Sequence, residues 1–397
     1  MMAAKKVRVG LVGLGLVSDS HVKGFQAHPD AEVVAVCDID EAHAKEVCEE
    51  YGIRKYYTDY SEMLKDEEIN LISICTPTFT HVNMTIQAAE AGKNILCEKP
   101  FCMTMEEGQK AVDAAKANGV TLTVEESYRF MTSILKAKEM IDAGEIGKPT
   151  QIRQRFGEWI PKEGVLDNRE TTEEHRGWRM NTKKAGGNGF PWMFDHCVHF
   201  FTAAEMLMGS PIKEVYSIMA DNTWMNKDTE DVVDMSLHGG TEIGDIALLT
   251  WSHEDPAVKG VWMRAEEING KYDYMTGFSI TVIGETGMIE VLGEGASGLQ
   301  YNGEDVHLVL HKKDGTVQTM RFEEGGDDIW KSEMSYYSHA HINLIRHMID
   351  NLIAGEESPY TGEMGIHDVK TTLAAICSAK EGTPVKVADV TDERYLK

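Results

Sequence analysis

Hydrophobic and polar residues follow a short, regular rhythm in the first third of the chain. Apolar runs rich in β-formers occur at Val7–Gly13, Glu32–Asp38, Leu71–Thr76, Asn94–Glu98 and Thr121–Glu125. Helical patterns lie between them, for example at Glu41–Tyr51, Thr80–Ala91 and Met105–Asn118. Strands that alternate with helices indicate βαβ units. Because parallel strands need crossover connections, which are almost always right-handed, we expect a doubly wound parallel sheet.

Beyond Ser127 the pattern changes to longer alternating strands. A helix around Leu135–Ala143 precedes them, and the chain turns helical again from Tyr336, with a last helix near Val369–Lys380. The predicted strands are Gln151–Trp159, Glu214–Ala220, Val232–Leu237, Asp245–His253, Phe278–Ile283, Val306–His311 and Val317–Phe322. Turn signals such as Lys313-Asp314-Gly315 separate several of them, as in antiparallel hairpins.

The predicted fold class is therefore α/β, with an N-terminal Rossmann sheet and a C-terminal α+β domain built on an open, largely antiparallel sheet. The length of 397 residues fits more than one domain. We place a dinucleotide-binding domain at 1–127 and a substrate-binding and oligomerisation domain at 128–335. A helical segment at 336–397 is expected to pack back on the core.

Composition and charge limit the classes of binding partner that we expect for this protein. The formal net charge is −26, and no cluster of Lys and Arg offsets it, which disfavours nucleic acids and anionic membrane surfaces as partners. The seven cysteines lack the paired spacings of a zinc site and mostly lie in apolar runs, as reduced core residues do. No export signal and no apolar stretch of roughly 18 residues is evident. We therefore expect a cytoplasmic protein.

The first strand runs into a glycine-rich turn. Residues 13–18 read G-x-G-x-x-S, and helical periodicity begins directly after them. Gly13 permits a tight turn, Gly15 lets the backbone approach a pyrophosphate, and the following helix start, with Leu16 and Val17, offers amide donors. Ser18 replaces the third glycine of the usual motif. Such turns also occur in many strand–helix corners that bind nothing.

An acidic residue at the end of the second strand strengthens the prediction of a dinucleotide site. Asp38 lies 25 positions after Gly13, where a ribose-binding carboxylate belongs, although an exposed strand-end acid would also fit. The residues that follow, Ile39, Asp40 and Glu41, provide no cation for a 2′-phosphate. We therefore predict NAD rather than NADP as the cofactor.

Two further strand ends carry unusual chemistry, and ligands bind at the carboxyl ends of parallel strands. One end includes Thr76, Pro77, Thr78 and His81, and the other is Glu98-Lys99-Pro100. A lysine amine fixed between an acid and a proline would polarise a substrate oxygen near the nicotinamide. A solvated surface lysine is the alternative interpretation.

A second candidate group lies in the glycine-rich segment that leads to Phe190. If the residues after it form a helix, Asp195 and His199 are four positions apart and share one face. Alcohol oxidation needs a base for the hydroxyl proton, and histidine titrates in the right range. Such pairs are also often structural. A metal bound by His196, Cys197 and His199 is disfavoured because these positions do not face one point on a helix, and we predict no metal.

Taken together, the G-x-G-x-x-S turn, Asp38, Thr76-Pro77, Glu98-Lys99-Pro100 and the Asp195-x-x-x-His199 segment resemble the Gfo/Idh/MocA oxidoreductase family. The resemblance covers nearly the whole chain. It implies that Lys99 lies by the nicotinamide and the substrate hydroxyl, that His199 acts as acid and base, and that Asp195 binds or orients the substrate. Thr76, Pro77, His81 and Glu98 would line the cofactor.

The chain departs from the family pattern around the presumed base. Many relatives read Gly-Gly-Gly-x-Leu-x-Asp-x-Gly-x-His, whereas this chain has Phe190-Pro191-Trp192 before Asp195 and His196-Cys197 after it. His196 therefore competes with His199 as the base. The residues that we expect to contact the substrate are Tyr128, Arg129, Trp159, Trp178, Arg179, Trp192 and His196.

The predicted function is NAD-dependent oxidation of a secondary hydroxyl of a sugar, glycoside or cyclitol, with Lys99 and His199 in proton transfer. The segment from Phe190 to His196 and the Gly177-Trp178-Arg179 sequence resemble family members that oxidise glycosides at C3. Two alternatives stay open: an NAD-dependent glycoside hydrolase that uses transient oxidation and elimination, and a non-catalytic NAD-binding sensor. The resemblance also implies a homo-oligomer, either a dimer or a tetramer.

Overall fold

The computed structural model describes residues 6–156, 178, 182–219, 247–264, 278–293, 299–301, 304–322 and 338–396. The chain divides into two compact units, which are described separately. Unit 1 comprises Met1–Ser127, Lys183–Gly186 and His341–Val369. Unit 2 comprises Tyr128–Thr182, Gly187–Ala340 and Lys370–Lys397.

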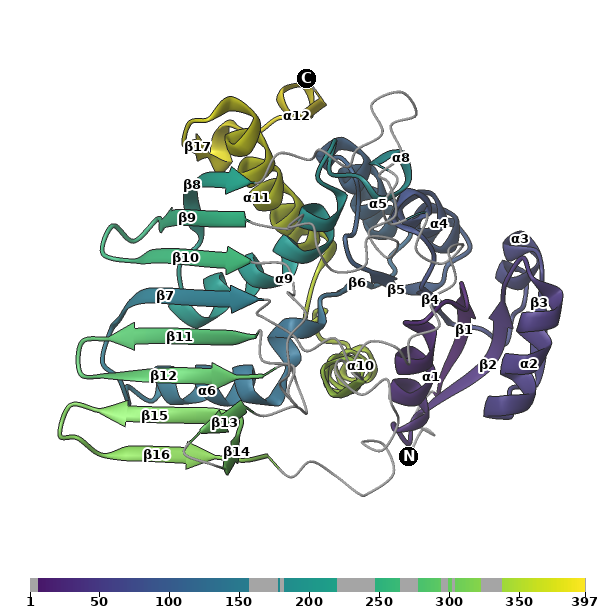
Figure 1. The fold of residues 1–397 in the computed structure, drawn as a ribbon. Helices are drawn as coiled ribbons and strands as arrows, with labels where there is room; N and C mark the ends of the chain where they lie inside the picture. Colours follow the sequence, from purple (N-terminus) through teal and green to yellow (C-terminus); the bar gives the residue numbers. More distant parts are fainter. Residues whose placement is uncertain are drawn as a thin grey trace, which may run out of the picture. The chain divides into compact units, whose positions relative to one another are not determined.

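A six-stranded parallel sheet forms the centre of unit 1 (Figure 1). The strands are β1 (Val7–Val12), β2 (Ala31–Cys37), β3 (Lys55–Tyr57), β4 (Leu71–Ile74), β5 (Asn94–Glu98) and β6 (Leu122–Glu125). Their order is β3-β2-β1-β4-β5-β6, and every neighbouring pair is parallel. The sheet reverses direction of winding at β1 and β4, so the predicted doubly wound Rossmann arrangement is confirmed.

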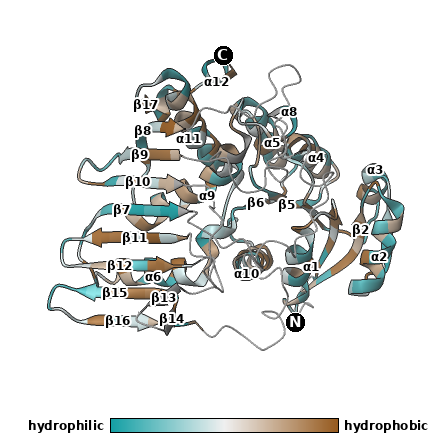
Figure 2. Ribbon diagram, in the orientation of Figure 1, coloured by the Kyte–Doolittle hydropathy of each residue, from teal (hydrophilic) through white to brown (hydrophobic). Residues whose placement is uncertain are grey.

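The helices of this sheet follow from local sequence signals. They are α1 (Ser18–Gln26), α2 (Glu41–Tyr51), α3 (Tyr60–Leu64), α4 (Thr78–Glu90) and α5 (Met105–Ala117). Helix α2 spans the predicted residues: Asp40 caps it by accepting hydrogen bonds from the amides of Ala42 and His43, and Gly52 ends it with φ +68°. Figure 2 shows β2 mainly in brown and α2 mainly in teal, the pattern of a buried strand beside an exposed helix.

The sequence analysis missed β3 and α3. Both are short, at three and five residues, and β3 is a partly exposed edge strand that pairs only with β2 among the described strands. Neither has enough residues to show a hydrophobic period.

Unit 2 is built on a nine-stranded sheet with the order β16-β15-β12-β11-β7-β10-β9-β8-β17. Its strands are β7 (Pro149–Phe156), β8 (Ile212–Met219), β9 (Ala247–His253), β10 (Lys259–Arg264), β11 (Ser279–Gly284), β12 (Gly287–Leu292), β15 (Leu308–Lys312), β16 (Val317–Met320) and β17 (Val385–Lys386). Strand β7 pairs with β10 in parallel, and the other pairs are antiparallel. The predicted open, largely antiparallel sheet is confirmed.

The remaining elements of the described residues are two short strands and a set of α-helices and 3₁₀-helices. They are η1 (Ser127–Phe130), α6 (Thr132–Asp142), α8 (Thr182–Ala185), α9 (Pro191–Met208), β13 (Leu299–Tyr301), β14 (Glu304–Val306), α10 (Ser338–Ala354), α11 (Gly362–Glu381), η3 (Val387–Asp389) and α12 (Asp392–Leu396). Of the predicted strands, Val232–Leu237 lies outside the described residues. Strands β10, β12 and β17 were not predicted.

Glycine is required where β10 crosses the Trp251 ring of β9. A Cβ atom on Gly260 would lie 2.0 Å from Cε2 of Trp251, a buried side chain whose Nε1 donates to His253. Trp251 is buried and is the direct register partner of Gly260, so an added methyl would press on closely packed atoms.

We expect Gly260→Ala to destabilise the protein by about 1–3 kcal/mol, because the added methyl overpacks the sheet. Denaturant unfolding of the purified variant measures this effect. Gly15→Ala is the matched control, since a Cβ there meets no atom within 4 Å. Equal stability of the two variants would contradict the prediction.

Candidate active site

The glycine turn of unit 1 is packed on one side and open on the other. Gly13 has φ +85°, and its amide donates to the carbonyl of Cys37 at 2.9 Å. A Cβ on Gly13 would lie 2.7 Å from Cγ2 of Thr76, whereas a Cβ on Gly15 would meet nothing within 4 Å. The first glycine therefore makes the turn possible, and the second leaves free space at the backbone, as an approaching pyrophosphate requires.

Ser18 occupies the position of the third glycine without disturbing the turn. Its hydroxyl is buried and donates to the carbonyl of Gly15 at 2.7 Å. The side chain thus supplies a local hydrogen bond at the beginning of α1, where Val17 is the N-cap and Leu16 is largely exposed. The amide of Ser18 donates to the carbonyl of Gly15 at 3.0 Å, so α1 begins directly on the glycine turn, and the positive end of the helix dipole lies there.

Asp38 holds the glycine turn from the end of β2. Its Oδ2 accepts a hydrogen bond from the amide of Leu14 at 2.8 Å, and its Oδ1 accepts one from the amide of Asp40 at 3.0 Å. A carboxylate offers about four acceptor positions, so this partly exposed group retains capacity for a ribose diol.

His81 joins the two chemically unusual strand ends. Its Nε2 lies 2.7 Å from the carbonyl of Thr76, and its Nδ1 lies 2.9 Å from the carbonyl of Pro100. Burial lowers the pKa of His81 despite these two carbonyl contacts, which favour the charged ring. The segment with Pro77 and Thr78, which begins α4, is therefore fixed relative to the segment that follows β5.

Glu98 is the last residue of β5 and is buried next to Lys99. Its Oε2 accepts a hydrogen bond from the backbone amide of Lys99 at 3.1 Å, and its Oε1 lies 2.9 Å from Nε2 of His21. Burial raises the pKa of Glu98, but the hydrogen bond from His21 and the charges of His21, His341 and Lys99 lower it to about 2. The carboxylate is thus held as an anion at the base of the lysine.

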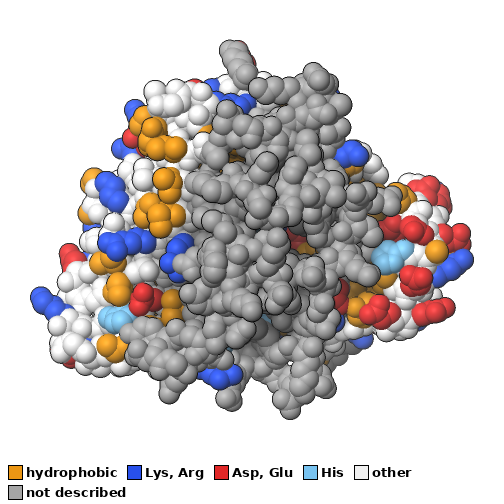
Figure 3. All heavy atoms as spheres, viewed as in Figure 1, with side chains coloured by type: hydrophobic (Ala, Val, Ile, Leu, Met, Phe, Trp, Pro, Cys, Tyr) orange, Lys and Arg blue, Asp and Glu red, His pale blue; other side chains and the backbone are white. Residues whose placement is uncertain are grey.

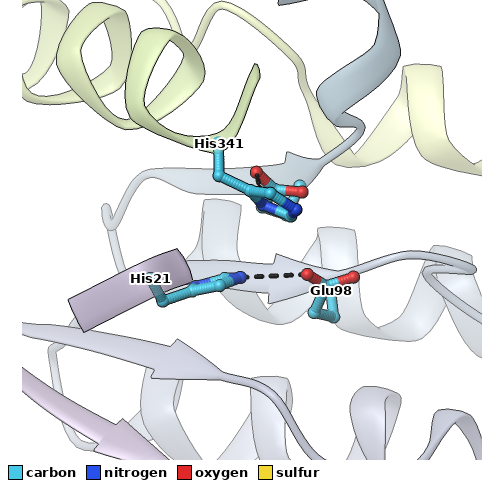
Figure 4. Close-up of side chains that lie close together, drawn as sticks. His21, Glu98 and His341 are labelled. Atoms are coloured by element: carbon cyan, nitrogen blue, oxygen red, sulfur yellow. Dashed lines mark hydrogen bonds and ion pairs between the residues drawn. The ribbon is translucent and has the colours of Figure 1, made fainter. Parts of the chain in front are cut away.

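The structure adds residues that the sequence analysis missed. His21, on α1, and His341, on α10, meet the carboxylates of Glu98 and Glu125 inside unit 1 (Figure 4). His341 Nδ1 lies 2.7 Å from Oε1 of Glu125, and His21 Nδ1 lies 2.8 Å from the hydroxyl of Ser73. His21 and Glu98 are 77 positions apart in the sequence, and Glu125 and His341 are 216 positions apart. No rule of sequence spacing could therefore have revealed these two ion pairs.

In unit 2, the segment with the candidate base is helical, which meets the condition under which Asp195 and His199 share one face. Asp195, His196 and His199 lie on α9, which begins at Pro191. The His199 ring is buried and stacks on the buried ring of Tyr128, with centroids 4.0 Å apart and planes 12° apart. Asp195 Oδ2 lies 3.7 Å from Nε2 of His196. The imidazole of His199 is thus held in one orientation by packing.

The other residues expected at the substrate are only partly described. Arg129 lies on η1, beside Tyr128, and is partly buried, as is Trp178. Trp192 lies in the first turn of α9. Trp159 and Arg179 lie outside the described residues, as does the side chain of Trp192.

Comparison with known families identifies the two halves. Residues 7–126 match the model described as "Oxidoreductase family, NAD-binding Rossmann fold", and residues 138–387 match "Oxidoreductase family, C-terminal alpha/beta domain". This chain belongs to the Gfo/Idh/MocA oxidoreductase family. The first of these descriptions names an NAD-binding Rossmann fold, so NAD as the predicted cofactor is confirmed.

Curated relatives of this Gfo/Idh/MocA chain include sugar and cyclitol dehydrogenases. It is 24% identical to myo-inositol 2-dehydrogenase of Thermotoga maritima over 97% of this chain and 99% of the relative. It is 29% identical to D-glucoside 3-dehydrogenase of Escherichia coli over 53% of this chain and 56% of the relative. These findings confirm the predicted enzyme class, an NAD-dependent oxidoreductase of the sugar dehydrogenase kind.

Solved structures share the fold over the whole chain. Scyllo-inositol dehydrogenase of Lactobacillus casei, solved with NAD(H) and scyllo-inositol, superposes with a TM-score of 0.70 at 18% identity, covering 97% of this chain and 100% of that one. Among the described residues, no helix combines the length and hydrophobicity that crossing a membrane requires.

Gly15 provides a test of the cofactor site in this Gfo/Idh/MocA chain. Gly15→Val should weaken NAD binding by roughly tenfold or more, which corresponds to about 1.4 kcal/mol, because the side chain would occupy the open space at the turn. Isothermal titration with NAD measures the dissociation constant. The thermal midpoint without NAD serves as the control and should stay near that of the natural protein. Unchanged NAD affinity would place the pyrophosphate elsewhere.

Proposed function

We propose that this protein oxidises a secondary hydroxyl of a sugar, glycoside or cyclitol with NAD, and that C3 of a glycoside is the preferred position. The observation that carries the proposal is the similarity to D-glucoside 3-dehydrogenase and to inositol dehydrogenases within one NAD-binding family. The C3 preference rests further on the resemblance of the Phe190–His196 segment to glycoside 3-oxidising members. In this reaction a hydride leaves the carbon for the nicotinamide, and the hydroxyl proton leaves to a base.

The proposed roles follow from the local geometry of each residue. Lys99 follows a buried carboxylate that fixes its backbone amide, so the start of its side chain has a defined position. The amine of Lys99 would polarise the substrate oxygen and take part in the transfer of the hydroxyl proton. His199, held by the stack with Tyr128, would accept the hydroxyl proton, and Asp195 would bind or orient the substrate.

When NAD is bound, its nicotinamide ring supplies the carbon that accepts the hydride. The residues present fit this cofactor, since the glycine turn leaves open space at Gly15 and Asp38 retains acceptor positions for ribose hydroxyls. The partly exposed side chains of Leu16 and Thr76 flank the same turn.

The substrate class is tested with a panel of glucosides, free sugars and inositols. Purified protein is incubated with NAD and each compound, NADH absorbance is followed, and products are identified by NMR spectroscopy. The proposal expects NADH formation in step with a keto product, at C3 for a glucoside. Release of free sugar at constant NADH would instead identify an NAD-dependent glycoside hydrolase. Absence of turnover with bound NAD would favour a sensor.

We expect Lys99→Ala and His199→Ala each to lower kcat/KM by roughly 10²-fold or more, because each removes a proton-transfer group. Steady-state kinetics on the best substrate measures the loss. Lys65→Ala and His311→Ala are the matched controls, because these side chains pair with Glu62 and Glu290, to which no role in the reaction is assigned. Rates near those of the natural protein in both test variants would exclude the proposed roles.

We also propose that the protein is a homo-oligomer that uses the open face of the nine-stranded sheet. Ile218 on β8, Leu248 on β9 and Met263 on β10 are 54%, 43% and 46% exposed and lie opposite one another in the strand register. Hydrophobic side chains are visible over these strands in Figure 3. A contiguous exposed apolar row favours association with a second copy of the sheet.

Leu248→Glu should dissociate the oligomer, because it places a charge in the middle of this row. Light scattering after size-exclusion chromatography measures the mass. Val317→Glu is the control, since Val317 is 49% exposed but lies on the edge strand β16. A natural protein that is monomeric, or a Leu248→Glu variant of unchanged mass, would contradict the proposal.

We propose the cytoplasm as the site of action. Cys37, Cys75 and Cys97 are buried thiols, and burial raises the pKa of each, which keeps it protonated and unreactive. Such cysteines suit a reducing compartment.

A further inference from the structure

Four buried side chains of unit 1 bring two imidazoles and two carboxylates together. His21, Glu98, Glu125 and His341 each offer one ligand atom, and these atoms all lie within 4.8 Å of one another. None of the four side chains is more than 8% exposed. Figure 4 shows the rings of His21 and His341 on either side of the space at Glu98. Glu98 of this cluster also accepts a hydrogen bond from the backbone amide of Lys99, so the cluster adjoins the strand end that carries Lys99.

One atom of the cluster has no partner among the described residues. Oε2 of Glu125 is buried and makes no hydrogen bond, although Oε1 of the same carboxylate contacts His341. The whole residue has an exposure of 0%. A buried carboxylate oxygen without a donor is costly, and a cation next to it removes the cost.

We infer that His21, Glu98, Glu125 and His341 form a binding site for one divalent transition-metal ion, for which Zn²⁺ is the best match. Zinc takes imidazole nitrogens and carboxylate oxygens in tetrahedral sites with bonds of about 2.0–2.2 Å, which sets neighbouring donors about 3.4 Å apart. The donor atoms of His21 and Glu98 are 2.9 Å apart and those of His341 and Glu125 are 2.7 Å apart, so small side-chain rotations bring each pair to this spacing.

The charges of the cluster match a divalent ion. Two neutral imidazoles and two carboxylates carry a total of −2, which one divalent cation neutralises inside the protein. An imidazolium that pairs with its carboxylate in the absence of metal releases one proton to solvent when the ion binds, and its other ring nitrogen keeps its proton, so each ring ligates as a neutral imidazole. No change of oxidation state is involved.

Hydrogen bonds from neighbouring groups orient the side chains of the cluster, as metal sites require. Nδ1 of His21 lies 2.8 Å from the hydroxyl of Ser73, which leaves Nε2 directed at the cluster. Glu98 is held by the amide of Lys99 through its second oxygen. Hydrogen bonds of this kind fix the tautomer and the direction of metal ligands.

Four protein ligands without an open position are typical of a structural site. The ligands come from α1, β5, β6 and α10, so the ion would fasten a late helix to the parallel sheet. It would also fix the end of β5 from which Lys99 extends. The metal set weighed in the sequence analysis, His196, Cys197 and His199, is a different one.

The test is the metal content of untagged protein purified without chelator, measured by inductively coupled plasma mass spectrometry. We expect about one zinc ion per chain in the natural protein and less than a tenth of that in His341→Gln and Glu125→Gln. His28→Gln is the matched control: His28 is also buried and pairs with an acid of α10, Asp350, at 3.2 Å, but is not in the cluster. The His28→Gln variant should retain about one zinc ion per chain.

A second measurement needs no variant. Protein produced in zinc-poor medium with added Co²⁺ should show the intense visible absorption of tetrahedral cobalt, which added Zn²⁺ removes. Removal of the metal should lower the thermal midpoint by roughly 5 °C or more. Natural protein that holds no transition metal and takes up no Co²⁺ would overturn the inference and leave a proton-shared His–Glu network. NAD affinity and turnover are measured separately, so either proposal can fail alone.

Discussion

The hydrogen bond between His21 and Glu98 joins the two parts of unit 1 on which cofactor chemistry depends. His21 lies on α1, directly after the glycine turn, and Glu98 ends β5, directly before Lys99. Because both side chains are buried, the distance between the helix start and the strand end is fixed by a contact that water cannot replace. Without His21 the buried carboxylate would lose one of its two hydrogen-bond partners among the described residues and keep only the Lys99 amide, and removing one partner of a buried charge pair costs several kcal/mol.

Three further contacts hold the glycine turn and the neighbouring strand ends together. Gly13 packs on Thr76, Asp38 holds the amide of Leu14, and His81 bridges the carbonyls of Thr76 and Pro100. Each contact links a loop to its neighbour through backbone groups. The edge of the parallel sheet is therefore rigid at the proposed NAD site, as an oriented hydride transfer requires.

The sequence predicted the elements that carry strong local signals. Helix α2, with Asp40 at one end and Gly52 at the other, was predicted with both bounds correct, since caps are visible in the sequence. Strand β10 was missed because its six residues include charged ends and a glycine, and its parallel pairing with β7 depends on tertiary structure. The cofactor motif was predicted from its spacing, whereas His21 and His341 were not singled out, because only the fold brings them together with Glu98 and Glu125.

This difference follows from how each kind of site is built. A phosphate-binding turn is made of consecutive backbone groups, so glycines at fixed intervals reveal it in any sequence. A buried cluster of imidazoles and carboxylates is made of side chains from four elements, and each of them alone is indistinguishable from a core or surface residue. Glu125 shows this most clearly: it lies at the end of a hydrophobic strand, and only its unpartnered oxygen in the folded protein indicates that a further group belongs beside it. Sequence patterns therefore locate the cofactor, and packing is needed to locate what supports it.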